Sequence, residues 1–320
     1  MKEICLGPES DQKYIENYLA GIRALDPVEI ATLPEPIKLS DTLRMERFID
    51  VERFWEITQQ CIAECERKYA VSITAMQSER YYTAQPPEAD SIGGFHDMRS
   101  LGYQYWYHAS FVLTLNHRLA SKKTRTVELT RSFLHDCFHH STFRSFRRAI
   151  RIPSASTAEA KRRIPEIYRE QYGINFRNKD GFSYSSPELT NRSPETINLN
   201  VLMDGIVVAV VGALMHKVCG ERQASANCVD EAIINEIFLQ PFDAAILPQA
   251  SAFYSSVTEP SRKFVEHWGG DTLVILVLKA MMSGDLSLLK NFFEERTGIA
   301  HTWEKMFKTP GFSISENPAT

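Results

Sequence analysis

The segment Ile206–Met215 reads IVVAVVGALM and is the longest apolar run of the chain. Its length is about half of what a bilayer span needs, so it predicts a helix buried in a protein core. The triplet SPE at residues 193–195 is typical of a helix start, because serine caps the first turn, proline fits it and glutamate faces the positive end of the helix dipole. We therefore expect one helix from this triplet to about Cys219.

The same predicted helix carries Asp204, in the apolar sequence NLNVLMDGIVV at residues 198–208. A carboxylate in so apolar a helix needs a partner, because burial of an unpaired charge is costly. A metal ion is one such partner, so Asp204 is a candidate metal ligand.

Helical patterns of apolar residues also cover most of the remaining chain, whereas strand patterns are confined to residues 70–76 and 80–83. The sequence predicts a mainly α fold (α+β with at most a small sheet), with an N-terminal arm over residues 1–39 and one helical domain over residues 40–320. Residues 175–192 are expected to form an irregular stretch, either a lid, a binding loop or a disordered tether. The other expected helices span residues 40–69, 104–121, 126–150, 157–172, 228–242, 259–282 and 283–296, with one more around Trp303.

The composition is that of an ordinary globular protein, with 43% hydrophobic and 24% charged residues. The net charge of −4 gives no reason to expect nucleic acid or an anionic membrane as a partner. The first residues, MKEICLGPESDQKY, contain no apolar stretch, so we expect no secretory signal, no membrane span and a cytoplasmic location. The six scattered cysteines are too few for a disulfide scaffold in a chain of 320 residues.

The segment Ser132–Ser141, SFLHDCFHHS, brings three histidines and an acid into one predicted helix. His135 and His139 are four residues apart and share one face, so both imidazoles can reach a single metal ion. Asp136 then lies beside the ion and can take a proton from a bound water. The alternative is a polar cluster without metal, and the cost of burying several imidazoles without partners favours the metal site.

This HDxxH sequence resembles the HExxH motif of the zincin metallopeptidases, with aspartate where that family has glutamate. The resemblance covers only the motif helices. In the gluzincin branch the third ligand is a glutamate on a later helix, and the segment INEIF at residues 234–238 looks like that second motif.

The zincin resemblance implies a zinc-dependent hydrolase that cleaves a peptide or amide bond. Asp136 would act as the general base, and His140 would support the site or the oxyanion. Glu231 is the fallback for the third ligand. The implied zinc ligands are His135, His139 and Glu236.

A second resemblance begins two residues earlier, because FLHD at residues 133–136 looks like the core of the HD-domain phosphohydrolases, an all-helical family. That family needs an upstream histidine, supplied by His117 or His108, and a downstream aspartate, supplied by Asp204, around iron or manganese. This resemblance gives His139 no role, whereas the zincin resemblance uses it. A third interpretation is a helical binding protein whose histidines only pack or sense pH.

Arginines recur at helical spacing just after the histidine motif, and such a stripe is able to bind an anionic group of a peptide or small-molecule substrate. A solvated helix face paired with acids is the simpler alternative. Nucleic acid is not expected, because no exposed aromatic residues are interleaved with the stripe. The oligomeric state is left open. The stripe consists of Arg144, Arg147, Arg148 and Arg151.

Overall fold

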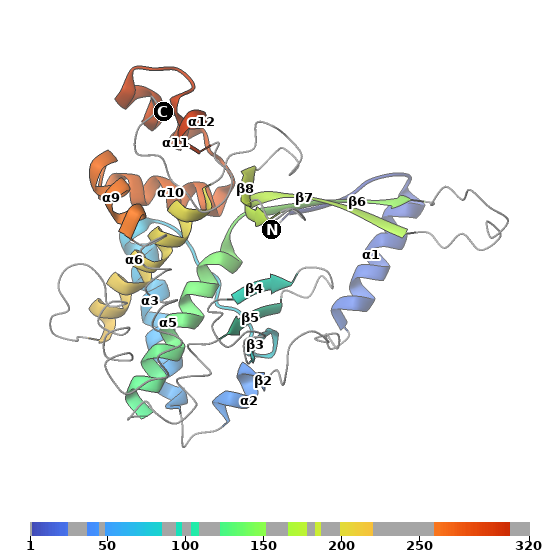
Figure 1. Ribbon diagram of the computed structural model, residues 1–320. Helices are drawn as coiled ribbons and strands as arrows, with labels where there is room; N and C mark the ends of the chain where they lie inside the picture. The colour runs from blue at the N-terminus through green and yellow to red at the C-terminus, as the bar shows by residue number, and fades with distance from the viewer. Residues whose placement is uncertain are drawn as a thin grey trace.

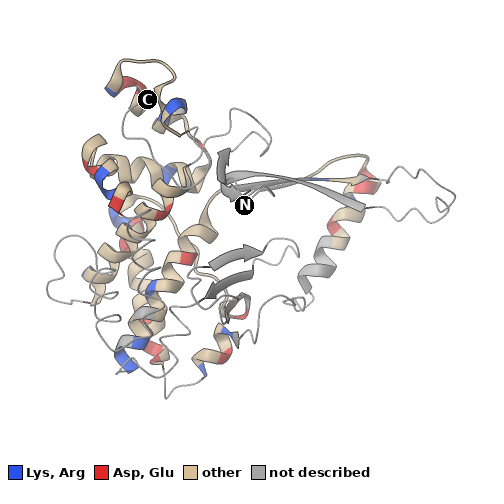
Figure 2. Ribbon diagram, viewed as in Figure 1, with Lys and Arg blue, Asp and Glu red and all other residues tan. Residues whose placement is uncertain are grey.

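Among the residues that the structure describes, helices make up most of the regular structure, and the strands form two small sheets (Figure 1). The predicted mainly helical fold is confirmed. Acidic and basic residues are interspersed along the described helices, as the small net charge leads us to expect (Figure 2). The computed structural model describes residues 2–24, 37–44, 49–84, 94–97, 104–108, 122–151, 166–177, 183–186, 199–219 and 259–307.

Three helices pack against one another at the centre of the hydrophobic core. They are α3 (Val51–Tyr69), α5 (Lys122–Ser141) and α6 (Asn200–Cys219). Aromatic rings join the first two, with the centroids of Phe54 and Phe133 5.3 Å apart. Within α6 the window Val201–Cys219 is long and apolar enough to cross a membrane, but 67% of it is buried, and the core helix of a soluble protein meets the same criteria.

The helix predicted over residues 40–69 is in fact two helices, α2 (Leu39–Leu43) and α3. A local signal starts the second one, because the carboxylate of Asp50 accepts the N–H of Arg53 at 3.1 Å and caps α3. Ala70, in the left-handed conformation with φ 54°, ends it. The strand predicted over residues 70–76 is wrong, since this stretch belongs to neither sheet.

The last described part of the chain is a group of short helices, which we call the C-terminal helices. They pack around shared aromatic rings such as Phe264 and Phe293, whose centroids are 5.8 Å apart. The helix predicted over residues 259–282 is split at Gly269–Gly270, and Gly270 has φ 52°, a conformation that favours glycine. The C-terminal helices are α9 (Glu259–Trp268), α10 (Asp271–Ser283), α11 (Ser287–Thr297) and α12 (Thr302–Phe307).

One sheet has the strand order β1-β6-β7-β8. Strand β1 runs parallel to β6, whereas β6, β7 and β8 are antiparallel neighbours. Helix α1 (Glu9–Ala24) packs on β6, so residues predicted to form an arm contribute a strand and a helix here. The strands are β1 (Lys2–Cys5), β6 (Arg144–Arg151), β7 (Glu166–Arg177) and β8 (Ser183–Ser186).

Strands β6 and β7 correct two predicted helices, over residues 126–150 and 157–172. Helix α5 ends at Ser141, and both later segments are strands. The end of β7 has apolar residues at every second position, Tyr172, Ile174 and Phe176, which is the period of a strand. The predicted loop over residues 175–192 includes the end of β7 and all of β8.

The helical arginine stripe is also wrong, because its members lie on strand β6. The helical period that predicts the stripe does not apply to a strand, which repeats every two residues. The binding of an anionic substrate group by this segment stays a prediction.

The second sheet has the order β2-β3-β5-β4. Strand β3 confirms the strand predicted over residues 80–83. The helix predicted over residues 104–121 is wrong at its start, which is strand β5, and residues 109–121 lie outside the described residues. The elements are β2 (Ile37–Lys38), β3 (Tyr81–Ala84), β4 (Gly94–Asp97) and β5 (Gln104–His108), with the 3-10 helix η1 (Ser78–Arg80) before β3.

Candidate metal centre

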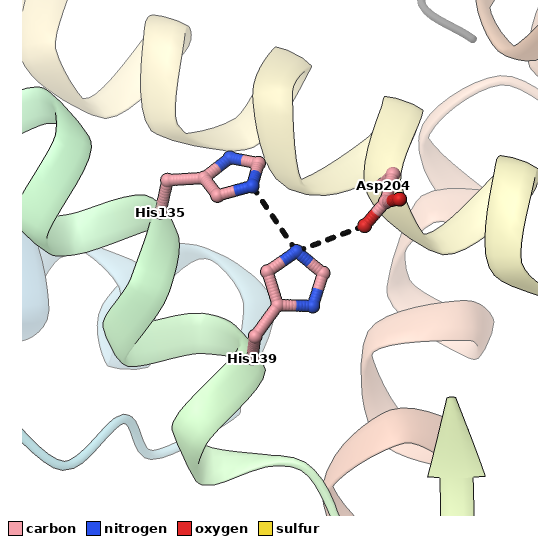
Figure 3. Close-up of side chains that lie close together, drawn as sticks. All are labelled: His135, His139 and Asp204. Carbon is pink, nitrogen blue, oxygen red and sulfur yellow. Dashed lines mark hydrogen bonds and ion pairs between the residues drawn. The ribbon is translucent and has the colours of Figure 1, made fainter. Parts of the chain in front are cut away.

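Two histidines of α5 and one aspartate of α6 meet between these helices (Figure 3). The Nε2 atom of His139 lies 3.1 Å from Nε2 of His135 and 2.9 Å from the Oδ1 atom of Asp204. One ligand atom from each residue lies within 4.8 Å of the other two. Within the described part of the chain, this is the one group of at least three His, Cys, Asp or Glu residues close enough to hold a metal ion.

His135 and His139 lie on the same face of α5, as their four-residue spacing predicts. Their ring centroids are 4.8 Å apart, and both rings are turned toward α6 (Figure 3). Helix α6 supplies the third group because the residues around Asp204, such as Met203 and Val207, are buried in the core and fix the rotation of the helix. The predicted proximity of the two imidazoles is therefore confirmed, and Asp204 is the carboxylate that lies beside them.

The three side chains are largely enclosed, with 8% of His139 and 16% of Asp204 exposed. The pKa of His135 is well below its usual value, first because protein surrounds the ring and then because His139 and Arg131 disfavour a further positive charge. His135 is therefore neutral near pH 7, and the neutral imidazole is the form that binds metals.

Hydrogen bonds among the three side chains do not satisfy all of their ligand atoms. The Nε2 atom of a neutral imidazole either carries one hydrogen or offers one lone pair. If Nε2 of His139 carries the hydrogen and donates it to Asp204, the same hydrogen must be shared with Nε2 of His135. If Nε2 of His139 instead accepts a hydrogen from His135, its lone pair also faces the carboxylate oxygen of Asp204. A cation placed between the three atoms satisfies all of them at once, so the donor set fits a metal ion.

Asp136, the predicted general base, has a buried partner of its own. Its Oδ2 atom accepts a hydrogen bond from the hydroxyl of Tyr81 at 2.7 Å, and Asp136 is only 2% exposed. Tyr81 begins strand β3 and is fully buried against Phe133 of α5. The bond therefore ties the second sheet to α5 next to the first histidine, and the role of Asp136 as a base stays a prediction.

Two more residues of α5 bind the segment that connects α3 to β3. The N–H of Met76 donates to Sγ of Cys137 at 3.4 Å, and the N–H of Thr74 donates to Oγ of Ser141 at 2.9 Å. Burial raises the pKa of the Cys137 thiol, so it stays protonated. We call Asp136, Cys137 and Ser141 together the anchored face of α5, because each bonds another part of the fold, and we call His135 and His139 the histidine face.

Comparisons with family models, with curated proteins and with solved structures give no match. The zincin and HD-domain resemblances stay predictions, and the case for a function depends on the geometry of the site.

Some of the other predicted site residues are described by the structure and some lie outside the described residues. His140 is partly buried in the last turn of α5, and its predicted role as a helper of the site stays a prediction. His108 lies on β5. Glu236, Glu231 and His117 lie outside the described residues, so the zincin third ligand also stays a prediction.

Proposed function

We propose that the protein is a metal-dependent hydrolase whose ion is held by His135, His139 and Asp204. The observation that carries the proposal is the meeting of three ligand atoms within 4.8 Å, from two helices and in a largely enclosed place. A neutral histidine pair with a carboxylate is a common ligand set for zinc and for iron in proteins.

Two of the three distances between ligand atoms are close to those of a tetrahedral site. Zinc binds nitrogen and oxygen at about 2.0–2.2 Å, so neighbouring ligand atoms around it lie about 3.3–3.6 Å apart. The two contacts of His139, at 3.1 and 2.9 Å, are slightly shorter than this, and a small outward rotation of the side chains makes room for the ion.

Three protein ligands leave one position for water or substrate, which is the pattern of catalytic rather than structural zinc sites. When bound, such an ion polarises a carbonyl or phosphoryl oxygen and lowers the pKa of water toward neutrality. The residues of the chain hold the ion, keep His135 neutral and limit the access of bulk water. We propose a peptide or amide bond as the substrate, in line with the zincin resemblance.

Phosphoester hydrolysis is the second candidate, and one observation favours it. Asp204, which the HD-domain resemblance selected, lies in the cluster. Against it, Asp136, which that family also needs, is bound to Tyr81, and His139 takes a place that the family does not use. Under this alternative, manganese or iron would support hydrolysis of a simple phosphoester, whereas zinc with a peptide library would give no cleavage.

The first test is metal analysis of protein purified without a histidine tag. We expect about one zinc per chain, and loss of that zinc in His135→Ala and in His139→Ala. His216→Ala is the matched control, because His216 lies near the other end of α6 and should leave the zinc in place. Wild-type protein that takes up no divalent metal would contradict the proposal.

The same assay decides the third ligand. If Asp204 holds the ion, Asp204→Ala loses zinc and Glu236→Ala keeps it. If the zincin resemblance holds in its original form, Glu236→Ala loses zinc. Loss in both variants would indicate a site with two carboxylates.

A further inference from the structure

The C-terminal helices contact helix α6 and the turn that follows helix α5. Helix α9 packs on α6, and the hydroxyl of Ser261 donates to the carbonyl oxygen of Leu202 at 3.4 Å. Leu202 is two residues before Asp204, and both partners of this bond are buried. One end of the candidate site is therefore attached to α9.

The other attachment is at the end of α5. The N–H of Phe143 donates to the carbonyl oxygen of Met281 in α10 at 2.7 Å. The Phe143 ring lies against Gly284, which ends α10 with φ +77°. A methyl group added at Gly284 would meet three carbons of this ring closer than 3.0 Å. The ring therefore fills a space that only glycine leaves open.

A short, well-bonded turn connects this contact to His139. The hydroxyl of Thr142 donates to the carbonyl oxygen of His139 at 2.7 Å, and the N–H of Thr142 faces the same oxygen at 3.3 Å. Thr142 is buried. A shift of Phe143 is thus passed to the backbone of a candidate ligand with little room for the turn to absorb it.

We infer that the C-terminal helices set the spacing of the metal ligands, with Phe143 on Gly284 as the positioning contact. This inference rests on the proposed function. The ligands lie on two helices that pack on each other, and α9 and α10 add a second connection between α6 and the end of α5, so a shift of these helices changes the ligand spacing. Groups that orient metal ligands from outside typically change metal affinity 10- to 100-fold when they are removed. By linkage, a bound metal must in turn tighten the contact of these helices.

Two C-cap glycines allow a matched test. Gly284 and Gly298 end α10 and α11 with φ 77° and 67°, so an alanine at either one pays the same kind of backbone strain. Only Gly284→Ala also clashes sterically with the Phe143 ring, because no described atom lies within 4 Å of a methyl group at Gly298. The difference between Gly284→Ala and Gly298→Ala therefore isolates the ring contact.

The measurements are the zinc Kd, by chelator competition, and the visible absorption spectrum of bound Co²⁺, which reports ligand geometry. We expect Gly284→Ala to bind zinc at least about tenfold more weakly and to change the Co²⁺ spectrum, while Gly298→Ala keeps the wild-type values. Equal Kd values and spectra in the two variants would overturn the inference and leave the proposed function intact. Wild-type protein that binds no metal would overturn both.

A measurement on wild-type protein covers the case in which Gly284→Ala does not fold. Hydrogen exchange is followed at the Phe143 amide and in α10, with and without zinc. We expect zinc to slow exchange at both places, and to leave the first turn of α3 unchanged. Equal exchange with and without zinc, in protein shown to hold the ion, would overturn the inference.

Discussion

The histidine face and the anchored face of helix α5 use polar residues in opposite ways. On the anchored face each polar group is bonded to a protein partner, as Asp136 is to Tyr81. On the histidine face the groups converge on one another, with His139 shared between His135 and Asp204. Paired polar groups contribute to folding, whereas converging lone pairs call for a ligand. This contrast is why we propose the metal site on the histidine face.

The largest expected effect is on the histidine face. Asp204→Asn keeps the size of the side chain but removes the negative charge, so zinc affinity should fall about 100-fold. At a zinc concentration of 100 times the wild-type Kd, the ion should stabilise wild-type protein by about 2.7 kcal/mol and the variant by little. Thermal unfolding with and without zinc measures this difference. If zinc stabilises both proteins equally, Asp204 is not a ligand of the ion.

The second effect is on the anchored face and should be independent of metal. Tyr81→Phe removes the hydroxyl that donates to the buried carboxylate of Asp136, so we expect a loss of about 2 kcal/mol in the free energy of unfolding. The zinc Kd of the variant should stay within a few-fold of wild type. Tyr14→Phe is the control, because Tyr14 is 48% exposed on α1. If Tyr81→Phe abolishes zinc binding without loss of stability, the two faces are not separate.

A smaller effect is expected for Cys137→Ala, about 1 kcal/mol, because the side chain is buried but short. Chemical labelling gives an independent check in wild-type protein. Burial raises the pKa of the Cys61 and Cys65 thiols to about 12, and the pKa of Cys137 is also raised. We expect alkylation of the partly exposed Cys5 and Cys219 before these three. Rapid labelling of Cys137 in folded protein would show that the anchored face opens.

The smallest effect concerns an ion pair at the surface, away from both faces. Glu64 bonds Arg67 and Lys217 of α6, and these cations lower the pKa of its carboxyl from 4.5 to about 2. A lowered pKa gives stability that is complete above pH 4.5 and is lost as the pH falls toward 2. Glu64→Gln should therefore be slightly less stable than wild type at pH 7 and equal to it near pH 2. A difference that persists at low pH would point to packing instead of charge.

Local patterns were sufficient to predict part of the molecule. The apolar run at residues 206–215 predicts α6, and the four-residue spacing of His135 and His139 predicts that their rings meet. Both depend on the geometry of a single helix. The match of Asp204 to these rings depends on how α6 lies on α5. Apart from the HD-domain resemblance, the sequence indicates only that this carboxylate needs a partner.

The sequence predicts helices where strands β6 and β7 form, and the reason is physical. Arginines at 144, 147, 148 and 151 fit a helical period, and no local signal outweighs that fit. Their strand conformation is fixed by pairing with other segments, such as Lys2 of β1 opposite Ser145. Pairing between distant segments is not visible in a short stretch of sequence, so the helix predicted over residues 126–150 extends past Ser141, where α5 ends. The aromatic residues of β5 were read as a helix for the same reason.

The parallel pairing of β1 with β6 has a consequence for how the chain is made. Strand β1 is made before its partner β6 and stays unpaired until Ser145 to Arg148 have followed it, so this edge of the sheet cannot close when β1 emerges from the ribosome. Until then its backbone groups are open to water or to a chaperone. A bulky affinity tag placed at the start of the chain would lie beside this edge and slow its closure.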